Sequence, residues 1–530
     1  MSRGYTAERL RSDPIWTLAF TFAGREYRLS SVQGFVLDDE GQEDVLYGEI
    51  EIPDLQRAAD IYALDPAAAS VPLDLYLPDT DVPTLYGYGL DLVGVEAELS
   101  ILFPGDTWED RLPQLIGQLG GIRYASSDAP IRAVLESRPD LSDEPILYRA
   151  ARIGTDTFTS PGSGALGAAY PFVFGSSPGY GWTDPGGTAH NTSASPAWIA
   201  DTDTLLIGLG PVGAEGASVR AWNDQDSSSE SFTVSASTDR LGVQIAVLDV
   251  SAASTLTIDG ADRYFVRWDG GGGFVSEDGT TLDQLGDLVW YLLTSRYSGR
   301  IDRARLRAVL PWLNQISVSG YVDDPEIGVW SWLRANVLDA LPLAAAQSPD
   351  GLYLIPLFLA APPEEAVTHL RIDEAIYVLD AETTQIQIGS AGDVVNSVSV
   401  SYALRARTGD YLGAVSVVGE DADGDQIESA RARRSVARYG VRSAALESPI
   451  IYDAASAALL ANWTIEARAY PQRRIVYGLD PRWAWIQAGA IVLVSHSEYG
   501  LEDCPARVLR RGWRAGWPFI ELWLRPVNAV

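Results

Sequence analysis

The chain contains very little cysteine and histidine. Cys504 is the single cysteine in 530 residues, so one chain can form neither an intrachain disulfide nor a cysteine-based metal site. This excludes a secreted scaffold held together by disulfides. The histidines, His190, His369 and His496, are too far apart in sequence for a zinc motif, and HExxH does not occur. We expect no cofactor and no metal, with a metal site built from carboxylates alone as the open alternative.

Long apolar runs are also missing. The longest, at residues 352–363, is too short to span a bilayer and is broken by prolines. The stretch MSRGYTAERLRSDPIW at the beginning of the chain lacks the apolar core of a signal peptide. We therefore expect a soluble protein, made in the cytoplasm of its host cell, with no membrane insertion by this chain.

Basic charge is scarce as well. The 71 acidic residues outnumber 39 basic residues, all of them arginine, and the formal net charge is −32. Such a chain repels nucleic acid and anionic membranes on average. A solvated acidic surface is the simpler interpretation, and a protein that lets DNA pass without holding it is the other. The content of 46% hydrophobic and 21% charged residues is that of a globular protein.

Alternating apolar residues predict antiparallel β structure near the N-terminus. The segment WTLAFTFAGREYRL alternates and then reaches Ala23-Gly24, which is typical of a hairpin. Residues 73–77 and 95–103 alternate in the same way. Short β-prone runs separated by turn-forming residues follow from residue 154 to residue 268, and they predict an inserted β-sandwich-like domain. Its exit linker is the GGGG run at residues 270–273.

A helical block comes next. Apolar residues recur at three- and four-residue spacing in three stretches, namely Leu282, Leu285, Val289 and Leu292; Leu306, Val309 and Leu313; and Trp330, Leu333, Val337 and Leu341. Pro311 and Pro342 are expected to break or end these helices. Farther on, Asp453 is expected to cap a helix over AASAALLANWTIEAR, between strands predicted at residues 394–406, 475–479, 483–495 and 518–527.

These patterns predict a mainly β fold with a helical segment, an α+β multidomain protein. The length is that of about three or four domains. We divide the chain into an N-terminal β domain at residues 1–150, an inserted β-rich domain at 151–275, a helical or mixed domain at 276–365, and a C-terminal β domain with one helix at 366–530.

Three short motifs suggest chemistry and are better explained as loops. Gly208-x-Gly210-x-x-Gly213 has dinucleotide spacing, but a β and turn sequence follows where a helix would have to begin, so a turn between strands is favoured. GSSPG at residues 175–179 has the spacing of a nucleophile elbow, but Pro178 has no N–H for an oxyanion. DADGD at residues 421–425 lacks the glycine and glutamate positions of a calcium loop.

The pattern of charged residues in the sequence does not indicate a catalytic site. With 71 carboxylates, the sequence singles out no glycosidase pair. Arginines cluster late in the chain, at Arg431, Arg433, Arg434, Arg438, Arg473, Arg474, Arg507, Arg510, Arg511 and Arg514. A phosphate-binding strip is one interpretation. The interspersed apolar residues and the acidic whole favour salt bridges across a protein interface. We expect no catalytic residue and no enzyme.

Several longer stretches point to one family, namely YPFVFG at residues 170–175, SPAWIADTDTLLIGLGPVGA at 195–214 and the stretch 329–357. Together they resemble tail hub proteins of tailed bacteriophages. Residues 448–495 and 507–527 are similar to the closing tube-like domain of that family, the trimeric baseplate hub, which also occurs in gene transfer agents. The sequence departs from the family where AGAI, at residues 488–491, replaces the family's G-D-x-V.

The resemblance implies a homotrimer in which each chain contributes two related tube-like β-barrel or sandwich domains. Three chains would then present six such domains to a six-fold tail tube and taper toward a three-fold central fibre or spike. The implied partners are the tail tube protein, the distal tail protein and the tape measure protein, in a virion tail tip or baseplate. Double-stranded DNA would pass along an acidic wall without specific binding.

The inserted domain is expected to face outward and contact neighbouring tail proteins or a host surface glycan. Tyr180, Trp182, Trp198 and Trp222 are its candidates for stacking on sugars, with core packing as the commoner role of such residues. Two other classes stay open from the sequence. One is a tail-associated enzyme that acts on carbohydrate or cell wall, and the other is a cytosolic binding protein unrelated to virions.

Overall fold

The structure is a computed structural model of residues 1–530. It describes residues 14–32, 36–39, 42–45, 48–51, 70–77, 92–123, 130–136, 145–147, 152–175, 181–183, 189–191, 195–210, 218–225, 228–268, 281–357, 365–371, 376–377, 386–404, 409–419, 426–514 and 517–524. The predicted linker at residues 270–273, the acidic turn at 421–425 and residues 176–179 of GSSPG lie outside these ranges.

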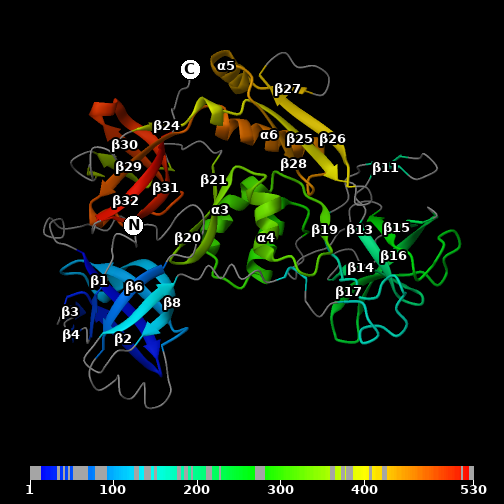
Figure 1. Cartoon of the computed structure of the whole chain (residues 1–530), viewed down its shortest axis with the longest axis horizontal. Helices are drawn as coiled ribbons and strands as arrows, with labels where there is room; N and C mark the ends of the chain where they lie inside the picture. The colour runs from blue at the N-terminus through cyan, green and yellow to red at the C-terminus, as the bar shows by residue number, and fades with distance from the viewer. Residues whose placement is uncertain are drawn as a thin grey trace.

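The chain is mainly β, as predicted, and its strands form several separate sheets around a helical centre (Figure 1). In Figure 1 the N-terminal strands, in blue, lie below the C-terminal strands, in red. The helices of the middle of the chain lie beside both, and the insertion projects on the far side of those helices. No helix of the described residues is long and apolar enough to cross a membrane.

The N-terminal strands close into a barrel, here called the N-terminal barrel. Its order is β1 (Ile15–Phe22), β2 (Arg25–Ser30), β5 (Gly48–Glu51), β6 (Ser70–Tyr76), β9 (Ile131–Glu136), β8 (Leu112–Arg123) and β7 (Glu96–Leu102). The predicted hairpin is confirmed, with Ala23 and Gly24 at φ 49° and 79° in the turn. One pairing differs from the antiparallel expectation, because β2 and β5 run parallel. β3 (Val36–Asp39) and β4 (Gln42–Val45) form a separate hairpin.

The insertion also closes into a barrel, a more specific arrangement than the sandwich-like expectation. Its order is β13 (Ser195–Asp201), β14 (Thr204–Leu209), β17 (Gln244–Asp249), β16 (Ser229–Thr238), β15 (Ser218–Asn223) and β18 (Tyr264–Trp268). β14 pairs antiparallel with β13 and β17 and contains Gly208 of the glycine motif. Gly213 lies outside the described residues, so the turn expected at this motif stays a prediction. β10 (Phe172–Phe174) pairs with β19 (Gly320–Val322), and β11 (Gly181–Thr183) pairs with β12 (Ala189–Asn191).

The helical centre buries the predicted apolar faces. Its elements are α2 (Leu285–Tyr291), which continues as the π-helix η4 (Leu292–Arg296), α3 (Arg303–Leu313), and α4 (Val329–Leu333), which continues as the π-helix η5 (Arg334–Leu338). All of the spaced apolar residues named above are buried. Pro311 was expected to break or end α3, but it lies inside this helix. The helical bonding continues past it, since the carbonyl of Leu310 accepts a bond from Asn314 N at 2.8 Å. The hairpin of β20 (Leu343–Ser348) and β21 (Gly351–Pro356) follows.

The described residues of the C-terminal part form two sheets. The first, here called the C-terminal sheet, has the order β22 (Thr368–Arg371), β30 (Ile491–His496), β31 (Leu501–Arg514), β32 (Trp517–Leu524), β29 (Arg473–Leu479) and β23 (Ile376–Tyr377), with β24 (Gln387–Ile388) also on β29. The second has the order β27 (Gln426–Glu428), β26 (Tyr411–Val418), β25 (Ser397–Leu404) and β28 (Ser443–Glu447).

Helix α6 (Ala454–Arg468) packs on this second sheet, and α5 (Ala430–Tyr439) packs beside α6. The Asp453 cap is confirmed, since its carboxylate accepts a bond from Ser456 N at 2.7 Å. The strand predicted at residues 483–495 begins only at Ile491. Residues before it form a 3-10 turn (Pro481–Trp483) capped by Asp480 and then a loop with Gly489 at φ 80°, which a strand cannot accommodate.

Candidate functional site at the junction of the terminal β domains

The N-terminal barrel and the C-terminal sheet share a buried contact, here called the junction, which consists of Trp16, Gln114, Ala484, Arg511 and Trp513. Ala484 and Trp513, from the C-terminal part, belong to the same apolar cluster as the core of the N-terminal barrel. The rings of Trp16 and Trp513 meet edge to face with centroids 4.8 Å apart. Such aromatic pairs contribute about 0.5–1.5 kcal/mol beyond the area that they bury. Opposite ends of the polypeptide therefore share one core.

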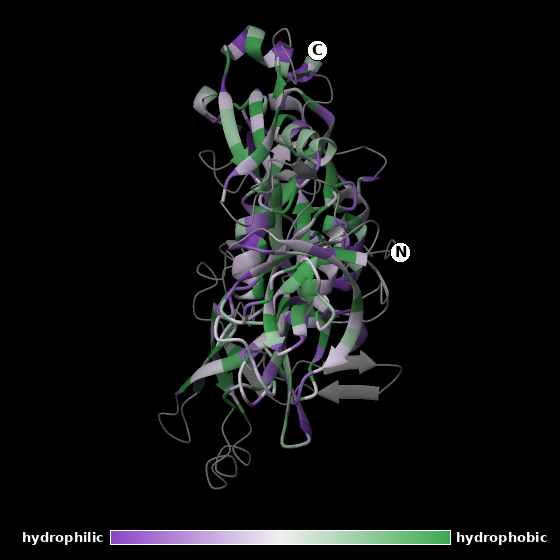
Figure 2. Cartoon of the chain, turned by 90° about the vertical axis from the view of Figure 1, so that its right-hand side faces the viewer, coloured by the Kyte–Doolittle hydropathy of each residue, from purple (hydrophilic) through white to green (hydrophobic). Residues whose placement is uncertain are grey.

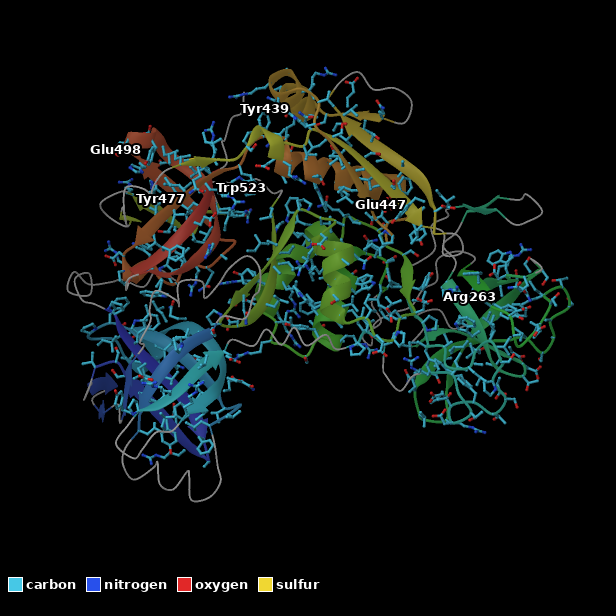
Figure 3. All side chains as sticks on the ribbon, in the orientation of Figure 1. Arg263, Tyr439, Glu447, Tyr477, Glu498 and Trp523 are labelled. Carbon is cyan, nitrogen blue, oxygen red and sulfur yellow. The ribbon has the colours of Figure 1, made fainter. Side chains whose placement is uncertain are left out.

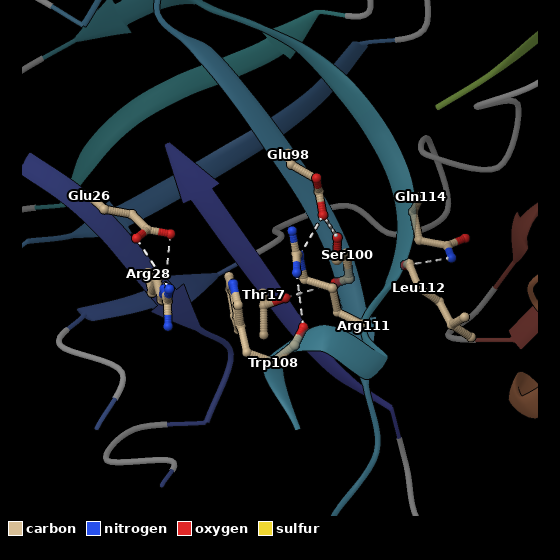
Figure 4. Close-up of polar contacts among 9 residues, drawn as sticks. All are labelled: Thr17, Glu26, Arg28, Glu98, Ser100, Trp108, Arg111, Leu112 and Gln114. Atoms are coloured by element: carbon tan, nitrogen blue, oxygen red, sulfur yellow. Dashed lines mark hydrogen bonds and ion pairs between the residues drawn. The ribbon is translucent and has the colours of Figure 1, made fainter. Parts of the chain in front are cut away.

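Polar bonds fix the direction of this contact. The Arg511 side chain is 5% exposed, and its Nη1 donates to the carbonyls of Ala484 at 2.7 Å and Ile486 at 3.1 Å. Arg511 Nη2 and Trp513 Nε1 both donate to Gln114 Oε1, each at 3.1 Å. Gln114 is 1% exposed and returns its own Nε2 hydrogen to the carbonyl of Leu112 at 3.0 Å, a contact drawn in Figure 4.

The junction depends on all of these bonds together. A buried guanidinium is costly unless its N–H groups are satisfied, and here carbonyl and amide oxygens accept them. A rotation of the sheet against the barrel would take Gln114 Oε1 away from two buried donors, Arg511 Nη2 and Trp513 Nε1, because Gln114 belongs to the barrel. The carbonyls of Ala484 and Ile486 belong to the C-terminal part, like Arg511 itself, and hold its guanidinium in place. The two β domains are therefore held in one relative orientation.

The neighbouring wall of the N-terminal barrel is rigid for local reasons. Arg111 donates to Glu98 Oε1 at 2.8 Å and to the carbonyl of Trp108 at 3.0 Å, and Ser100 donates to Glu98 at 2.7 Å (Figure 4). The guanidinium carbons of Arg28 and Arg111 lie 4.7 Å and 4.9 Å from the Trp108 ring centroid. This network fixes the outer face of the strands that lead into the junction.

The helical centre supports the same arrangement. Tyr353, on β21, donates its hydroxyl to the carbonyl of Ala488 at 2.8 Å, and burial raises the pKa of this hydroxyl so that it stays a donor. Ile355 packs beside Gly489 in the same loop, where an added Cβ would lie 3.0 Å from its side chain. Arg300 reaches the N-terminal barrel through an ion pair with Glu96 at 3.1 Å. The centre therefore contacts both terminal β domains.

The late arginines do not form one strip. Arg511 lies in the junction, and Arg507 donates to the carbonyl of Gly489 at 3.0 Å, with a pKa lowered by burial of its guanidinium. Arg431 pairs with Glu466 at 3.4 Å and Arg474 with Glu521 at 3.2 Å, so these two salt bridges lie within the chain. Arg433 pairs with Glu428, and the Arg510 guanidinium lies 5.9 Å from the Phe519 ring centroid. The side chain of Arg514 lies outside the description.

The structure brings together a serine, a histidine and an aspartate that the sequence did not single out. His369 Nε2 lies 2.9 Å from Ser495 Oγ and 2.8 Å from Asp503 Oδ1. A catalytic relay needs the carboxylate on Nδ1 and the serine on Nε2. Here both contact the same nitrogen, so the cluster ties β22 to β30 and β31 without the geometry of a relay. His369 and Ser495 are 126 positions apart, so no sequence motif signals them.

The other candidates from the sequence lie elsewhere. Trp222, on β15 of the insertion barrel, is 3% exposed, so it is not open to a sugar. Trp198 is half-buried, with the guanidinium carbon of Arg263, labelled in Figure 3, 5.6 Å from its ring centroid. Trp182 stands opposite His190 in the register of β11 and β12, and its side chain, like Tyr180, lies outside the description. Among described residues, no three His, Cys, Asp or Glu side chains group as metal ligands.

Comparisons with known proteins give weak likenesses. No protein-family model and no curated protein matches the chain. Among solved structures, it is similar to a protein of the virion of a native gene transfer agent particle, at 14% identity and a TM-score of 0.37 over 73% of this chain and 91% of that chain.

It is also similar to a tail protein from Neisseria meningitidis MC58, at 12% identity and a TM-score of 0.33 over 97% and 96% of the two chains. The 43 kDa tail protein of prophage MuSo2 from Shewanella oneidensis is 8% identical, with a TM-score of 0.35 over 97% of each chain. At these identities and TM-scores, the likeness does not by itself assign a function to the chain.

Proposed function

We propose that the chain is a structural hub of a phage or gene transfer agent tail. Three copies would form a ring that joins the six-fold tail tube and the distal tail ring to a three-fold central fibre or spike. The ring would line the DNA exit channel at the tip of the tail. This is the function implied by the sequence resemblance, and the chain acts in it without making or breaking a bond.

The observation that carries the proposal is the junction. Two β domains from opposite ends of the polypeptide are fixed side by side by a shared core and by the buried bonds of Gln114, Arg511 and Trp513. A ring that bears the load of a tail needs such fixed pairs, because three chains then supply six sheet-rich domains in constant relative orientation. A flexible tether between the two domains would not position them.

Charge supports the same role. The net charge of −32 per chain repels the phosphates of DNA, so DNA passes such a ring with little adhesion. Screening by salt weakens this repulsion, since the Debye length falls from about 10 Å at 0.1 M to about 3 Å at 1 M salt. The outward-projecting insertion barrel leaves the junction side of the chain available for ring contacts.

Two measurements test the hub proposal. Multi-angle light scattering of the purified chain, alone and mixed with the tail tube protein of the same particle, should report a trimer in at least one condition. Mass spectrometry of purified particles should find the chain at a few copies per particle. A chain that stays monomeric in both conditions and is missing from the particles refutes the proposal.

A further inference from the structure

Strand β28 forms one end of the second sheet of the C-terminal part. The sheet order is β27, β26, β25 and β28, and among the described strands β28 pairs with β25 alone (Figure 1). The strand follows helix α5, which packs beside α6 and carries hydrophilic segments, drawn purple at the top of Figure 2. The other edge of β28 is therefore an end of the sheet in this part of the chain.

Bonds to β25 show which backbone groups of β28 point away from the sheet. Ser397 N donates to the carbonyl of Arg442 at 3.1 Å, and Ser448 N donates to the carbonyl of Ser401 at 2.9 Å. The two strands run parallel, so every second residue of β28 turns both its N–H and its C=O toward β25. Between Arg442 and Ser448, the residues that do so are Ala444 and Leu446. The other three turn these groups outward, namely Ser443, Ala445 and Glu447.

The three outward residues form the β28 edge, as we call it. Within the described residues, Ser443, Ala445 and Glu447 make no backbone hydrogen bond on this side. All three residues are exposed. The register with β25 has no bulge and the strand contains no proline, so the row of donors and acceptors is continuous. An exposed row of this kind is a template for pairing with another extended strand.

The side chains beside the β28 edge indicate which strand would fit it. Ala444 and Leu446 are half-buried against the main core, so the face that they share is apolar. On the opposite face, Glu447, labelled in Figure 3, is exposed and makes no ion pair in the described part of the chain. Directly opposite side chains of neighbouring strands interact, so an apolar residue next to Leu446 and a cation opposite Glu447 are favoured.

We propose that the β28 edge binds an extended segment of a partner protein as an additional antiparallel strand of the second sheet. Antiparallel pairing is slightly more stable per residue than parallel pairing. The segment alternates basic residues, on the face of Glu447, with apolar residues, on the face of Leu446. The net charge of −32 favours the same partner, because it attracts a cationic segment.

A second copy of β28 matches this edge less well. Antiparallel pairing of two copies about Ala445 would place Ser443 of each chain opposite Glu447 of the other, so both carboxylates would stay without a cation. The proposal goes beyond the hub role and does not depend on it, since one chain carries the whole edge.

The test uses the full chain and a fluorescein-labelled heptapeptide of alternating lysine and valine, with binding followed by fluorescence anisotropy. The variant Ala445→Pro loses one outward N–H but no bond to β25, and it should bind at least about tenfold more weakly than the wild type, as expected from the loss of one hydrogen bond. The matched control Ala445→Val keeps the N–H and should bind like the wild type. Neither substitution changes the charge, so unspecific attraction of lysine is equal in all three proteins. Circular dichroism checks that both variants are folded.

Hydrogen exchange locates the peptide on the chain. The amides of Ser443, Ala445 and Glu447 face outward, so they should exchange at least about tenfold more slowly when the peptide is bound. The amides of Ala444 and Leu446 face β25 and should change little. A second measurement leaves the chain unaltered: N-methylation of the lysines, whose N–H groups face β28 in antiparallel pairing, should abolish binding, and N-methylation of the valines should not.

Four outcomes overturn the proposal. Three are the absence of peptide binding to the wild type, equal binding to the wild type and a folded Ala445→Pro, and unchanged exchange of the three outward amides with the peptide bound. The fourth is an oligomer of the wild type without peptide that Ala445→Pro abolishes, which would identify a second copy as the occupant. A chain that binds the peptide but is missing from particles would refute the hub proposal and leave this one intact.

Discussion

The junction makes a strong prediction about Gln114. Replacement of Gln114 by leucine keeps the size of the side chain but removes the oxygen that accepts from Arg511 Nη2 and Trp513 Nε1. Both donors stay buried, since Arg511 is 5% and Trp513 2% exposed. The contact between the N-terminal barrel and the C-terminal sheet should therefore weaken even though each domain keeps its own core.

The magnitude follows from the two donors. A buried donor left without an acceptor costs about 1–3 kcal/mol, and a charged one costs more. Gln114→Leu leaves two such donors, and burial of the apolar leucine side chain offsets part of the cost. The free energy of unfolding should therefore fall by about 2–5 kcal/mol. Gln114→Glu should cost less, because its carboxylate still accepts from both donors and adds a favourable charge beside Arg511. Its second oxygen faces the Leu112 carbonyl, to which Gln114 Nε2 now donates, so two acceptors meet there and offset part of this gain.

Calorimetry and hydrogen exchange measure the effect. In Gln114→Leu, unfolding of the N-terminal barrel should separate from that of the rest of the chain and move to a lower temperature. The amide of Ile486, which donates to the Trp483 carbonyl at 3.0 Å beside the junction, should exchange at least about tenfold faster, since tenfold corresponds to about 1.4 kcal/mol. The control is Gln244→Leu, at an exposed glutamine on the insertion barrel.

One result would refute the reasoning. If Gln114→Leu and Gln244→Leu unfold within about 0.5 kcal/mol of each other, which is the range of ordinary surface substitutions, then the buried bonds do not hold the two domains together. The hub proposal would then lose the observation that carries it.

Three further predictions concern single sites. Asp453→Ala removes the acceptor for Ser456 N and should lower the free energy of unfolding by about 1 kcal/mol, while Asp453→Asn should cost less; urea titration measures both. Glu230 accepts bonds from three backbone N–H groups, led by Thr255, which lower its pKa from 4.5 to about 2. A lowered pKa stabilises the fold above pH 4.5, and this is lost as the pH falls toward 2, so Glu230→Gln should flatten the acid dependence of amide exchange at Thr255. Gly175 has φ 85°, and an added Cβ would lie 2.2 Å from the Val318 carbonyl, so Gly175→Ala should destabilise by more than about 1 kcal/mol in thermal unfolding, and an unchanged Tm would contradict this.

Local features of the fold could be predicted because neighbouring residues determine them. The turn at Ala23-Gly24, the Asp453 cap and the buried faces of α2, α3 and α4 each depend on side chains a few positions apart. Where local rules compete, the prediction was wrong. Pro311 was expected to break or end its helix, but α3 continues through it, and its last carbonyls still accept bonds. The strand expected from residue 483 begins only at Ile491, because Asp480 and Gly489 favour a turn and a loop before it.

The candidate site could not be predicted from short patterns. Gln114 and Arg511 are 397 positions apart, and nothing near either residue shows that the other would be its partner. The same holds for His369 with Ser495.

By itself, the sequence determined an acidic, mainly β chain with a helical centre, because composition and apolar periodicity fix charge and local structure. Only the tertiary structure decided that the insertion closes into a barrel, that the two ends of the chain share one core, and which arginines are buried as donors. The reason is that strand closure and side-chain burial depend on contacts between residues hundreds of positions apart, and each contact is stable only when the others have formed.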